Sequence, residues 1–254
     1  MVFLGRTENG EDGILVHANG FQKKVALEED LFSFRSGRSR ETPYTKDYDH
    51  LYELLRHEKE HGFTAWVLGP ACVFDARSRK AMCELIRAGF VDVILAGNAL
   101  ATHDLEGAYL RTALGQDIYT QRKKTNGHYH HMEVINKVRQ SGSIAQIIDD
   151  YDITDGILYE CVKKGVPFVW AGSIRDDGPL PEVYGDVYEA QDAMRHYIGQ
   201  ATTVIGLATQ LHTIATGNMT PSFRVIDGKL RPVYFYCIDI SEFAVNKLRD
   251  RGSL

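Results

Sequence analysis

The stretch VWAGSIRDDGPLP, residues 169–181, runs from an apolar strand straight into a loop crowded with polar side chains. The apolar run, residues 166–171, ends at Gly172 and is followed within five positions by Ser173, Arg175, Asp176 and Asp177. In a parallel sheet the loops at the carboxyl ends of the strands hold the ligand. A solvated turn in which Arg175 pairs with an aspartate is the plainer alternative. We favour a functional site, because two adjacent carboxylates beside an arginine exceed what a connecting loop requires.

Further apolar runs alternate with helix-like segments from residue 47 onward. Strands are expected at residues 64–69, 91–97, 166–171, 202–208 and 233–239, and helices at residues 48–60, 75–88, 98–114, 129–150, 155–164, 186–199 and 209–215, with a last helix from residue 241. Asp75 is the expected N-cap of the second helix, and Gly89 is expected to end that helix in a left-handed conformation. The fourth helix is expected to break around Ser141-Gly142. This alternation predicts an α/β fold, a mostly parallel Rossmann-like sheet flanked by helices.

The N-terminal residues 1–46 have a different pattern. Residues 14–27 form two short apolar runs around Asn19-Gly20, which is typical of a β-hairpin. We expect this segment to be a small β extension, packed on the subunits or swapped between them, and residues 47–254 to be the α/β domain. A second hairpin is expected at residues 224–231, turning at Asp227-Gly228.

Composition, net charge and cysteine spacing argue against several classes of protein. The chain has 254 residues, 44% of them hydrophobic and 25% charged, as in an ordinary globular protein. A net charge of −5 argues against a nucleic-acid partner, which needs a basic face. The four cysteines form no CxxC pair, so we expect neither a zinc site nor a disulfide framework, and a reducing, cytoplasmic setting. No apolar run approaches a membrane span, and the N-terminal run is too short for a signal peptide.

Three expected strand ends carry polar residues that suit a nucleotide. Asn98-Ala99 follows the second strand, residues 209–212 (Thr-Gln-Leu-His) follow the fourth, and Asp239 ends the last. Helix N-termini at such junctions attract phosphates, and a lone carboxylate accepts ribose hydroxyls. Each residue alone could be a simple helix cap, but their joint position favours a nucleotide site. The GxGxxG fingerprint is absent after the first strand.

Other ionisable residues leave alternatives open. The sequence GHYHH, residues 127–131, suggests a metal, but adjacent histidines point apart and no matching carboxylate spacing exists, so we predict none. His130 is one candidate for binding substrate or moving a proton. Glu160, on an apolar helix, is either one half of a structural ion pair or a base with a raised pKa. Gly217-Asn218 indicates a tight turn or a close approach to a ligand.

These motifs resemble the archaeal-type ornithine cyclodeaminase family, which includes the C-terminal portion of bifunctional arginine dihydrolase/ornithine cyclodeaminases (LOR/SDH type). The similar strings are LAGNALA (95–101), GHYHH (127–131), GSI (142–144), YECVKKGVPF (159–168), AGSIRDDGPLPEV (171–183) and ATGNM (215–219). The resemblance implies an NAD-binding sheet like that of deoxyhypusine synthase, and conversion of ornithine to proline with release of ammonia. It also implies a small amino-acid substrate and a homo-oligomer, a tetramer.

The resemblance also implies roles for individual residues. The cofactor NAD is expected at Asn98, Ala99, Asp177, Thr209, Gln210, Leu211, His212 and Asp239. We expect Arg175 to bind the substrate carboxylate, with Asn218 and His130 as further substrate contacts, and Asp176 and Glu160 to be catalytic. The alternatives are an NAD-dependent amine or amino-acid dehydrogenase, a transferase of the deoxyhypusine synthase type, and a non-catalytic NAD-binding protein.

Overall fold

The computed structural model of the chain describes residues 2–3, 14–15, 45–176, 178–241, 243 and 246–247. The chain forms two compact units, residues 1–48 and residues 49–254. In the first unit, β1 (Val2–Phe3) pairs antiparallel with β2 (Ile14–Leu15). The hairpin expected around Asn19-Gly20 and most of the helix expected from residue 241 lie outside the described residues.

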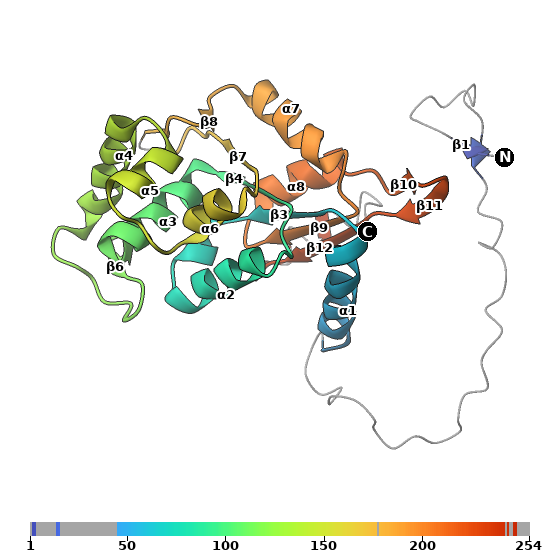
Figure 1. Cartoon of the computed structure of the whole chain (residues 1–254), viewed down its shortest axis with the longest axis horizontal. Helices are drawn as coiled ribbons and strands as arrows, with labels where there is room; N and C mark the ends of the chain where they lie inside the picture. The colour runs from blue at the N-terminus through green and yellow to red at the C-terminus, as the bar shows by residue number, and fades with distance from the viewer. Residues whose placement is uncertain are drawn as a thin grey trace, which may run out of the picture. The chain divides into compact units, whose positions relative to one another are not determined.

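The second unit is built on a six-stranded sheet with the order β12-β9-β3-β4-β7-β8 (Figure 1). Its strands are β3 (Thr64–Leu68), β4 (Val93–Gly97), β7 (Phe168–Ala171), β8 (Val183–Tyr184), β9 (Thr203–Leu207) and β12 (Tyr234–Ile238). Every neighbouring pair in this sheet is parallel. The predicted parallel α/β sheet is confirmed.

Helices occupy both faces of this sheet. They are α1 (Thr45–His61), α2 (Ala76–Arg87), α3 (Asn98–Leu110), α4 (His130–Ser141), α5 (Ile144–Asp150), α6 (Ile157–Lys164), α7 (Val187–Ile198) and α8 (Gln210–Met219), with 3-10 turns η1 (Pro70–Val73) and η2 (Gly127–Tyr129). No helix among the described residues is both long enough and apolar enough to cross a bilayer.

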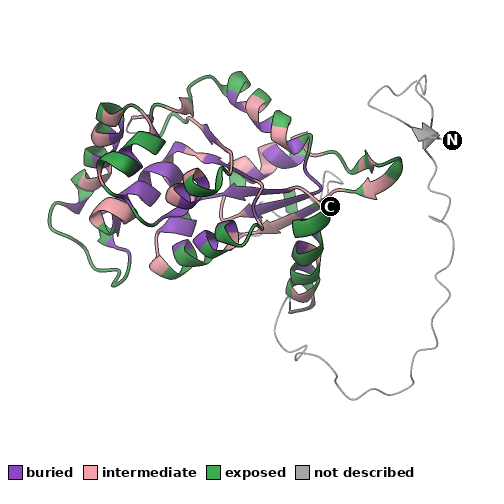
Figure 2. Cartoon of the chain, in the orientation of Figure 1, coloured by how far each residue is buried: buried purple, intermediate pink, exposed green. Residues whose placement is uncertain are grey.

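The central strands are buried on both sides, as their apolar composition requires (Figure 2). Because side chains alternate along a strand, Ala65 and Val67 of β3 join one core cluster with Met194 of α7, while Trp66 and Leu68 join the other cluster with residues of α2 and α3. The sheet thus lies between two apolar cores, one on each face.

Local signals in the sequence set the ends of several helices. The carboxylate of Asp75 accepts hydrogen bonds from the backbone N–H groups of Arg77 and Ser78, so Asp75 is the predicted N-cap of α2. Gly89 and Gly142 have φ of +77° and +91°, the left-handed conformation expected where α2 and α4 end. These predictions are confirmed.

Other boundaries differ from the sequence prediction. Helix α3 ends at Leu110 instead of residue 114, because Arg111 takes a left-handed φ of 60° and the chain turns into β5 (Thr112–Ala113), which pairs with β6 (Gln116–Asp117). Of the two alternatives for Gly217-Asn218, the tight turn is wrong, since α8 continues through both residues to Met219. Strand β8 was not predicted. The hairpin of β10 (Phe223–Ile226) and β11 (Lys229–Pro232) is confirmed, and both of its turn residues have positive φ.

Candidate functional site

The strand order reverses between β3 and β9, which are neighbours in the sheet. From β3 the chain proceeds to β4 on one side, whereas β9 and β12 lie on the other. In open parallel sheets the ligand crevice lies at such a switch point, outside the carboxyl ends of the strands. The residues that follow β3, β4 and β9 are therefore the candidates for a ligand site.

Gly69 allows the segments after β3 and β9 to meet at this point. Its N–H donates to the carbonyl of Leu207 at 2.9 Å, and a Cβ on Gly69 would lie 1.8 Å from the carbonyl oxygen of Ala208. The φ of Gly69 is −91°, which any residue adopts, so glycine is needed here for space. The close contact holds the segments after β3 and β9 against each other at the switch point.

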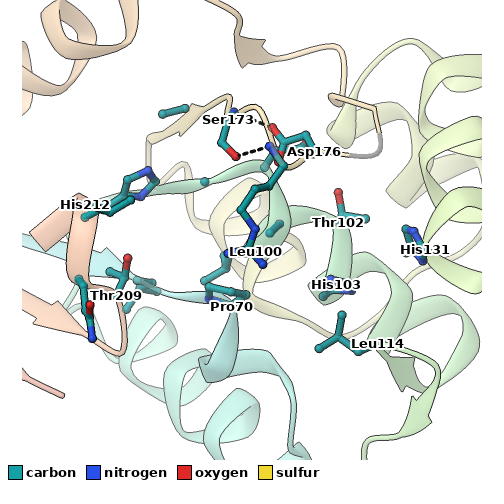
Figure 3. Close-up of a pocket in the computed structure, with 18 of the residues that line it drawn as sticks. Pro70, Leu100, Thr102, His103, Leu114, His131, Ser173, Asp176, Thr209 and His212 are labelled. Carbon is teal, nitrogen blue, oxygen red and sulfur yellow. Dashed lines mark hydrogen bonds between the residues drawn. The ribbon is translucent and has the colours of Figure 1, made fainter. Parts of the chain in front are cut away.

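A cavity of about 530 Å³ occupies the crevice (Figure 3), within the usual range of small-molecule and cofactor sites. Its lining comes from the segments after β3, β4, β7 and β9, and from α3 and α4. The lining residues are Leu68, Pro70, Gly97, Asn98, Ala99, Leu100, Thr102, His103, Leu114, His131, Ile135, Ala171, Ser173, Arg175, Asp176, Thr209, Gln210, Leu211 and His212.

Two helices begin at this cavity without a side-chain cap. The N-cap of α3 is Gly97, which has no side chain, and that of α8 is Thr209, whose side chain accepts no bond from the first turn. Asp75, Ser143 and Asp186 cap α2, α5 and α7, whereas α4 and α6 also begin without a side-chain cap. The first-turn N–H groups of α3 and α8 are thus open to an acceptor in the cavity, and the helix dipoles favour a negative charge there.

The loop after β7 brings a guanidinium and a carboxylate, of opposite charge, to the rim of the cavity. The N–H of Ser173 donates to Asp176 Oδ2 at 2.8 Å, and the N–H of Arg175 donates to Ser173 Oγ at 3.0 Å. These bonds hold the loop in a compact turn, which Figure 3 shows above the cavity. Asp176 is half-buried and Arg175 is exposed, so a carboxylate and a guanidinium both reach one space.

Asn98 fastens that loop to the start of α3. It is 3% exposed; its Nδ2 donates to the Gly178 carbonyl at 3.2 Å, and its Oδ1 accepts from the Leu180 N–H at 3.0 Å. The guanidinium of Arg139, on α4, also donates to the Pro179 carbonyl. Asn98 therefore lines the cavity and at the same time positions the loop that carries Arg175 and Asp176.

His212 faces the cavity from the first turn of α8 (Figure 3). Burial lowers the pKa of its imidazole, and the charge of Asp176 offsets part of that effect. A Cβ on Gly97 would lie 3.2 Å from His212 Cε1, so the missing side chain of Gly97 makes room for this ring. His212 is thereby favoured in its neutral form, as a hydrogen-bonding group.

The other end of the cavity lies between α3 and α4, where Thr102, His103, Leu114 and His131 surround it (Figure 3). The ring centroids of His103 and His131 are 6.1 Å apart. His103 Nδ1 lies 2.7 Å from Oε2 of Glu106, a fully buried carboxylate. One cavity thus has an end suited to phosphates and an end with ionisable side chains.

The structure brings eight of the predicted site residues together. Asn98, Ala99, Arg175, Asp176, Thr209, Gln210, Leu211 and His212 all line the cavity. Asp177 lies outside the described residues. Asp239 follows β12, beside β9, and its Oδ1 accepts from the Ser241 N–H at 2.8 Å; it does not line the cavity.

Three further predicted residues also lie outside the cavity lining. Glu160 is paired with Arg87 of α2, with 2.7 Å between Arg87 Nε and Glu160 Oε1, which is the structural-pair alternative. His130 contacts Thr112 through its Nδ1 at 2.7 Å. Asn218 is exposed on the last turn of α8.

Sequence reasoning missed Thr102, His103 and His131. The polar residues of α3 stand in a helix that is buried on nearly every side, so no amphipathic pattern marked them. The spacing of His103 and Glu106, three residues apart on one helix, is the signal that could have found His103. His131 belongs to the sequence GHYHH, from which only His130 was selected as a candidate.

The residues present fit NAD. A dinucleotide needs donors for its pyrophosphate and room for its length, and the uncapped starts of α3 and α8 stand at one continuous cavity. Gly97 has no side chain and Ala99 has only a methyl group, so the start of α3 is uncrowded. Thr209 and Gln210 add side-chain hydrogen-bonding groups.

Comparison with known proteins gives consistent matches. The family described as "Arginine dihydrolase ArgZ-like, C-terminal, Rossmann fold" matches residues 50–254. The ornithine cyclodeaminase of Methanothermobacter thermautotrophicus is 48% identical over 79% of this chain and 46% of its own length. The bifunctional arginine dihydrolase/ornithine cyclodeaminase AgrE of Nostoc sp. is 38% identical over 88% of this chain and 31% of its own length.

A solved structure also superposes well. The ternary complex of AgrE with ornithine and NAD+ has a TM-score of 0.75 and 36% identity, over 87% of this chain and 31% of that one. The chain spans about half the length of the archaeal relatives that it matches.

Proposed function

Because the chain belongs to the family of ArgZ-like C-terminal Rossmann domains, we propose that it is an NAD-dependent ornithine cyclodeaminase, which converts ornithine to proline and ammonia. The observation that carries the proposal is the single cavity, in which two uncapped helix N-termini share a space with Arg175, Asp176 and His103. AgrE, with which the chain shares its fold, forms a ternary complex with ornithine and NAD+.

The cofactor would lie along the strand ends. Residues 97–99 and 209–212 would hold it, the backbone N–H groups of α3 and α8 facing the pyrophosphate. Asp177 and Asp239 complete the proposed contacts. When bound, NAD would take a hydride from the α-carbon of the substrate and return it to a cyclic imine, so that the overall reaction has no net redox change.

The substrate would bind where the charged side chains meet. The guanidinium of Arg175 suits the α-carboxylate, which it can hold by two parallel hydrogen bonds. The carboxylate of Asp176, held in place by the Ser173 N–H, suits an ammonium group of the same molecule. A molecule with a carboxylate at one end and an amine at the other matches this arrangement, and ornithine is such a molecule.

The setting of the protein is part of the proposal. All four cysteines are free thiols and burial raises the pKa of each, as expected of inert thiols in a reducing cytoplasm. The apolar side chains of Phe223 and Val225 on β10 are exposed, and a second copy of the chain in a homo-oligomer would cover them.

Incubation of the chain with ornithine and NAD tests the activity. We expect proline and ammonia to form in equal amounts while absorbance from NADH does not accumulate. Steady accumulation of NADH would instead indicate an amino-acid dehydrogenase, and NAD binding without any product would indicate a non-catalytic NAD-binding protein. Either of these results would contradict the proposed function.

A further inference from the structure

A buried histidine–carboxylate pair stands at the end of the cavity away from the strand ends. His103 is 8% exposed and lines the cavity, and Glu106, one turn further along α3, is 0% exposed. The distance from His103 Nδ1 to Glu106 Oε2 is 2.7 Å. A carboxyl group in such a place requires partners for both oxygens, because an unpaired buried charge is costly.

Glu106 has those partners. The hydroxyl of Thr112 donates to Oε1 at 2.7 Å, and the N–H of Gly115 lies 3.4 Å from the same oxygen. Burial raises the pKa of Glu106, but the hydrogen bonds from His103 and Thr112 outweigh it, and the net shift is downward. Glu106 is therefore a carboxylate, able to accept hydrogen bonds at both oxygens.

The partners of Glu106 fix the protons around it. Thr112 has one hydroxyl proton, which it donates to Glu106, so its oxygen accepts from Nδ1 of half-buried His130 at 2.7 Å. In the same way His103 donates its Nδ1 proton to Glu106. Nε2 is then the ring nitrogen of His103 that carries the lone pair. Among the described residues, no side chain forms a hydrogen bond with Nε2.

Thr102, next to His103, gives an independent indication of a ligand at this end. It lines the cavity and is 3% exposed, and its hydroxyl has no hydrogen-bond partner among the described residues. Buried hydroxyls in folded proteins nearly always have a partner. Figure 3 shows Thr102 and His103 at the same end of the cavity, where a polar group of a bound molecule would supply the missing bond.

We propose that His103 is the base that deprotonates the substrate amine, with Glu106 as the residue that positions it. The inference rests on the proposed function. Both amines of ornithine are ammonium groups in neutral water, and neither can take part in imine formation or attack a carbon until its lone pair is free. In the step assigned here, an N–H bond of the ammonium breaks and its electron pair stays on nitrogen.

The proton then passes to Nε2 of His103, and no atom changes oxidation state. The imidazolium that forms is stabilised by the carboxylate of Glu106, as in other histidine–carboxylate pairs in which the acid holds the ring and its tautomer in place. The titratable groups facing His103 are Glu106 on its own helix and His131 on α4, with His130 behind Thr112.

His103→Asn tests this role. An asparagine amide can keep the donor to Glu106 but offers no basic nitrogen to the cavity. We expect kcat for proline formation to fall about 10²–10⁴-fold, the usual contribution of a general base, while the Kd values for NAD and ornithine, measured by calorimetry, stay unchanged. His196→Ala, which removes an exposed imidazole on α7, is the matched control and keeps wild-type kcat.

Two further variants separate a base from a structural residue. His103→Ala leaves a space for free imidazole, and added imidazole should restore part of its activity in proportion to concentration. Glu106→Gln should lower kcat and leave KM unchanged, because its amide donates to Nδ1 and moves the ring proton to Nε2. A purely structural role would not give rescue by imidazole.

The outcomes distinguish this role from the proposed function. Wild-type protein that makes proline, together with a His103→Asn variant of equal kcat or a His103→Ala variant that imidazole does not rescue, would overturn the role of His103 and leave the function standing. Wild-type protein that binds NAD but makes no proline would overturn both.

Discussion

At the scale of the residue, Asn98 links the fold to the site. Its amide makes two hydrogen bonds, to the backbone of Gly178 and of Leu180, from the first position of α3. Both groups of the amide are used at once, which no shorter or apolar side chain could do. The loop with Arg175 and Asp176 therefore depends on a residue that also lines the proposed cofactor site.

Replacement of Asn98 by alanine is predicted to lower stability by about 1–3 kcal/mol, because the buried Leu180 N–H is left without an acceptor. The same change should weaken NAD binding, since the loop loses its attachment to α3. Urea denaturation and calorimetric titration with NAD measure the two effects.

Gln146→Ala is the control for Asn98→Ala. Its amide also bonds a neighbour, Asp150 Oδ1 at 2.8 Å, but on an exposed surface. We expect a change of no more than about 0.5 kcal/mol. If both variants had the wild-type urea midpoint and NAD affinity, Asn98 would not position the loop.

The predicted residues that line the cavity are those for which chemistry and backbone signals coincided. Arg175, Asp176 and Asn98 stand directly after strand-like runs, so their position at the crevice followed from the order of elements. His130 and Glu160 have the right chemistry but different partners, Thr112 and Arg87. Their partners lie 18 and 73 residues away in sequence, and no local sequence pattern predicts contacts over such separations.

At the scale of the element, the junction of β3 with β9 is tightly constrained. Gly69 lies against the carbonyl oxygen of Ala208, and Ala208 itself has a left-handed φ of 55°. A non-glycine residue in this conformation is under strain, which is common beside functional sites. The segment carrying Thr209 and Gln210 leaves β9 through this strained residue.

Gly69→Ala is predicted to destabilise the chain by about 1–3 kcal/mol, because the added methyl group meets backbone that cannot rotate away. It should also lower NAD affinity, since the segments after β3 and β9 would be forced apart. Thermal denaturation with and without NAD measures both effects.

Gly185→Ala serves as the comparison, because nothing lies within 4 Å of a Cβ at that position and its φ is not left-handed. We expect it to be neutral or slightly stabilising. A Gly69→Ala variant as stable as Gly185→Ala would contradict the tight junction.

Element prediction was accurate for the long, strongly patterned segments. Strands β3, β4 and β9 are short apolar runs between helices, and α2 has its cap in the sequence. The misses have physical reasons. Strand β8 has two residues, too few for any periodicity, and in α8 Gly217 is buried together with Thr213 and Thr216, so the glycine marks a packed helix face and not a turn.

At the scale of the whole molecule, the site arises from topology. The five residues of β9 pair with those of β3, well over one hundred residues earlier in the chain. The sequence predicts parallel strands but not their order, because each apolar run fits either neighbour equally well. The reversal between β3 and β9 is visible only in the structure. It explains why the starts of α3 and α8, which the sequence assigned to one nucleotide site, meet at one cavity.

The most direct test of this cofactor site is a crystal structure of the chain grown with saturating NAD. We predict electron density for the dinucleotide across the carboxyl ends of β3, β4 and β9, with its pyrophosphate against residues 97–99 or 209–212. Density for NAD elsewhere on the molecule, with those residues unoccupied, would contradict it.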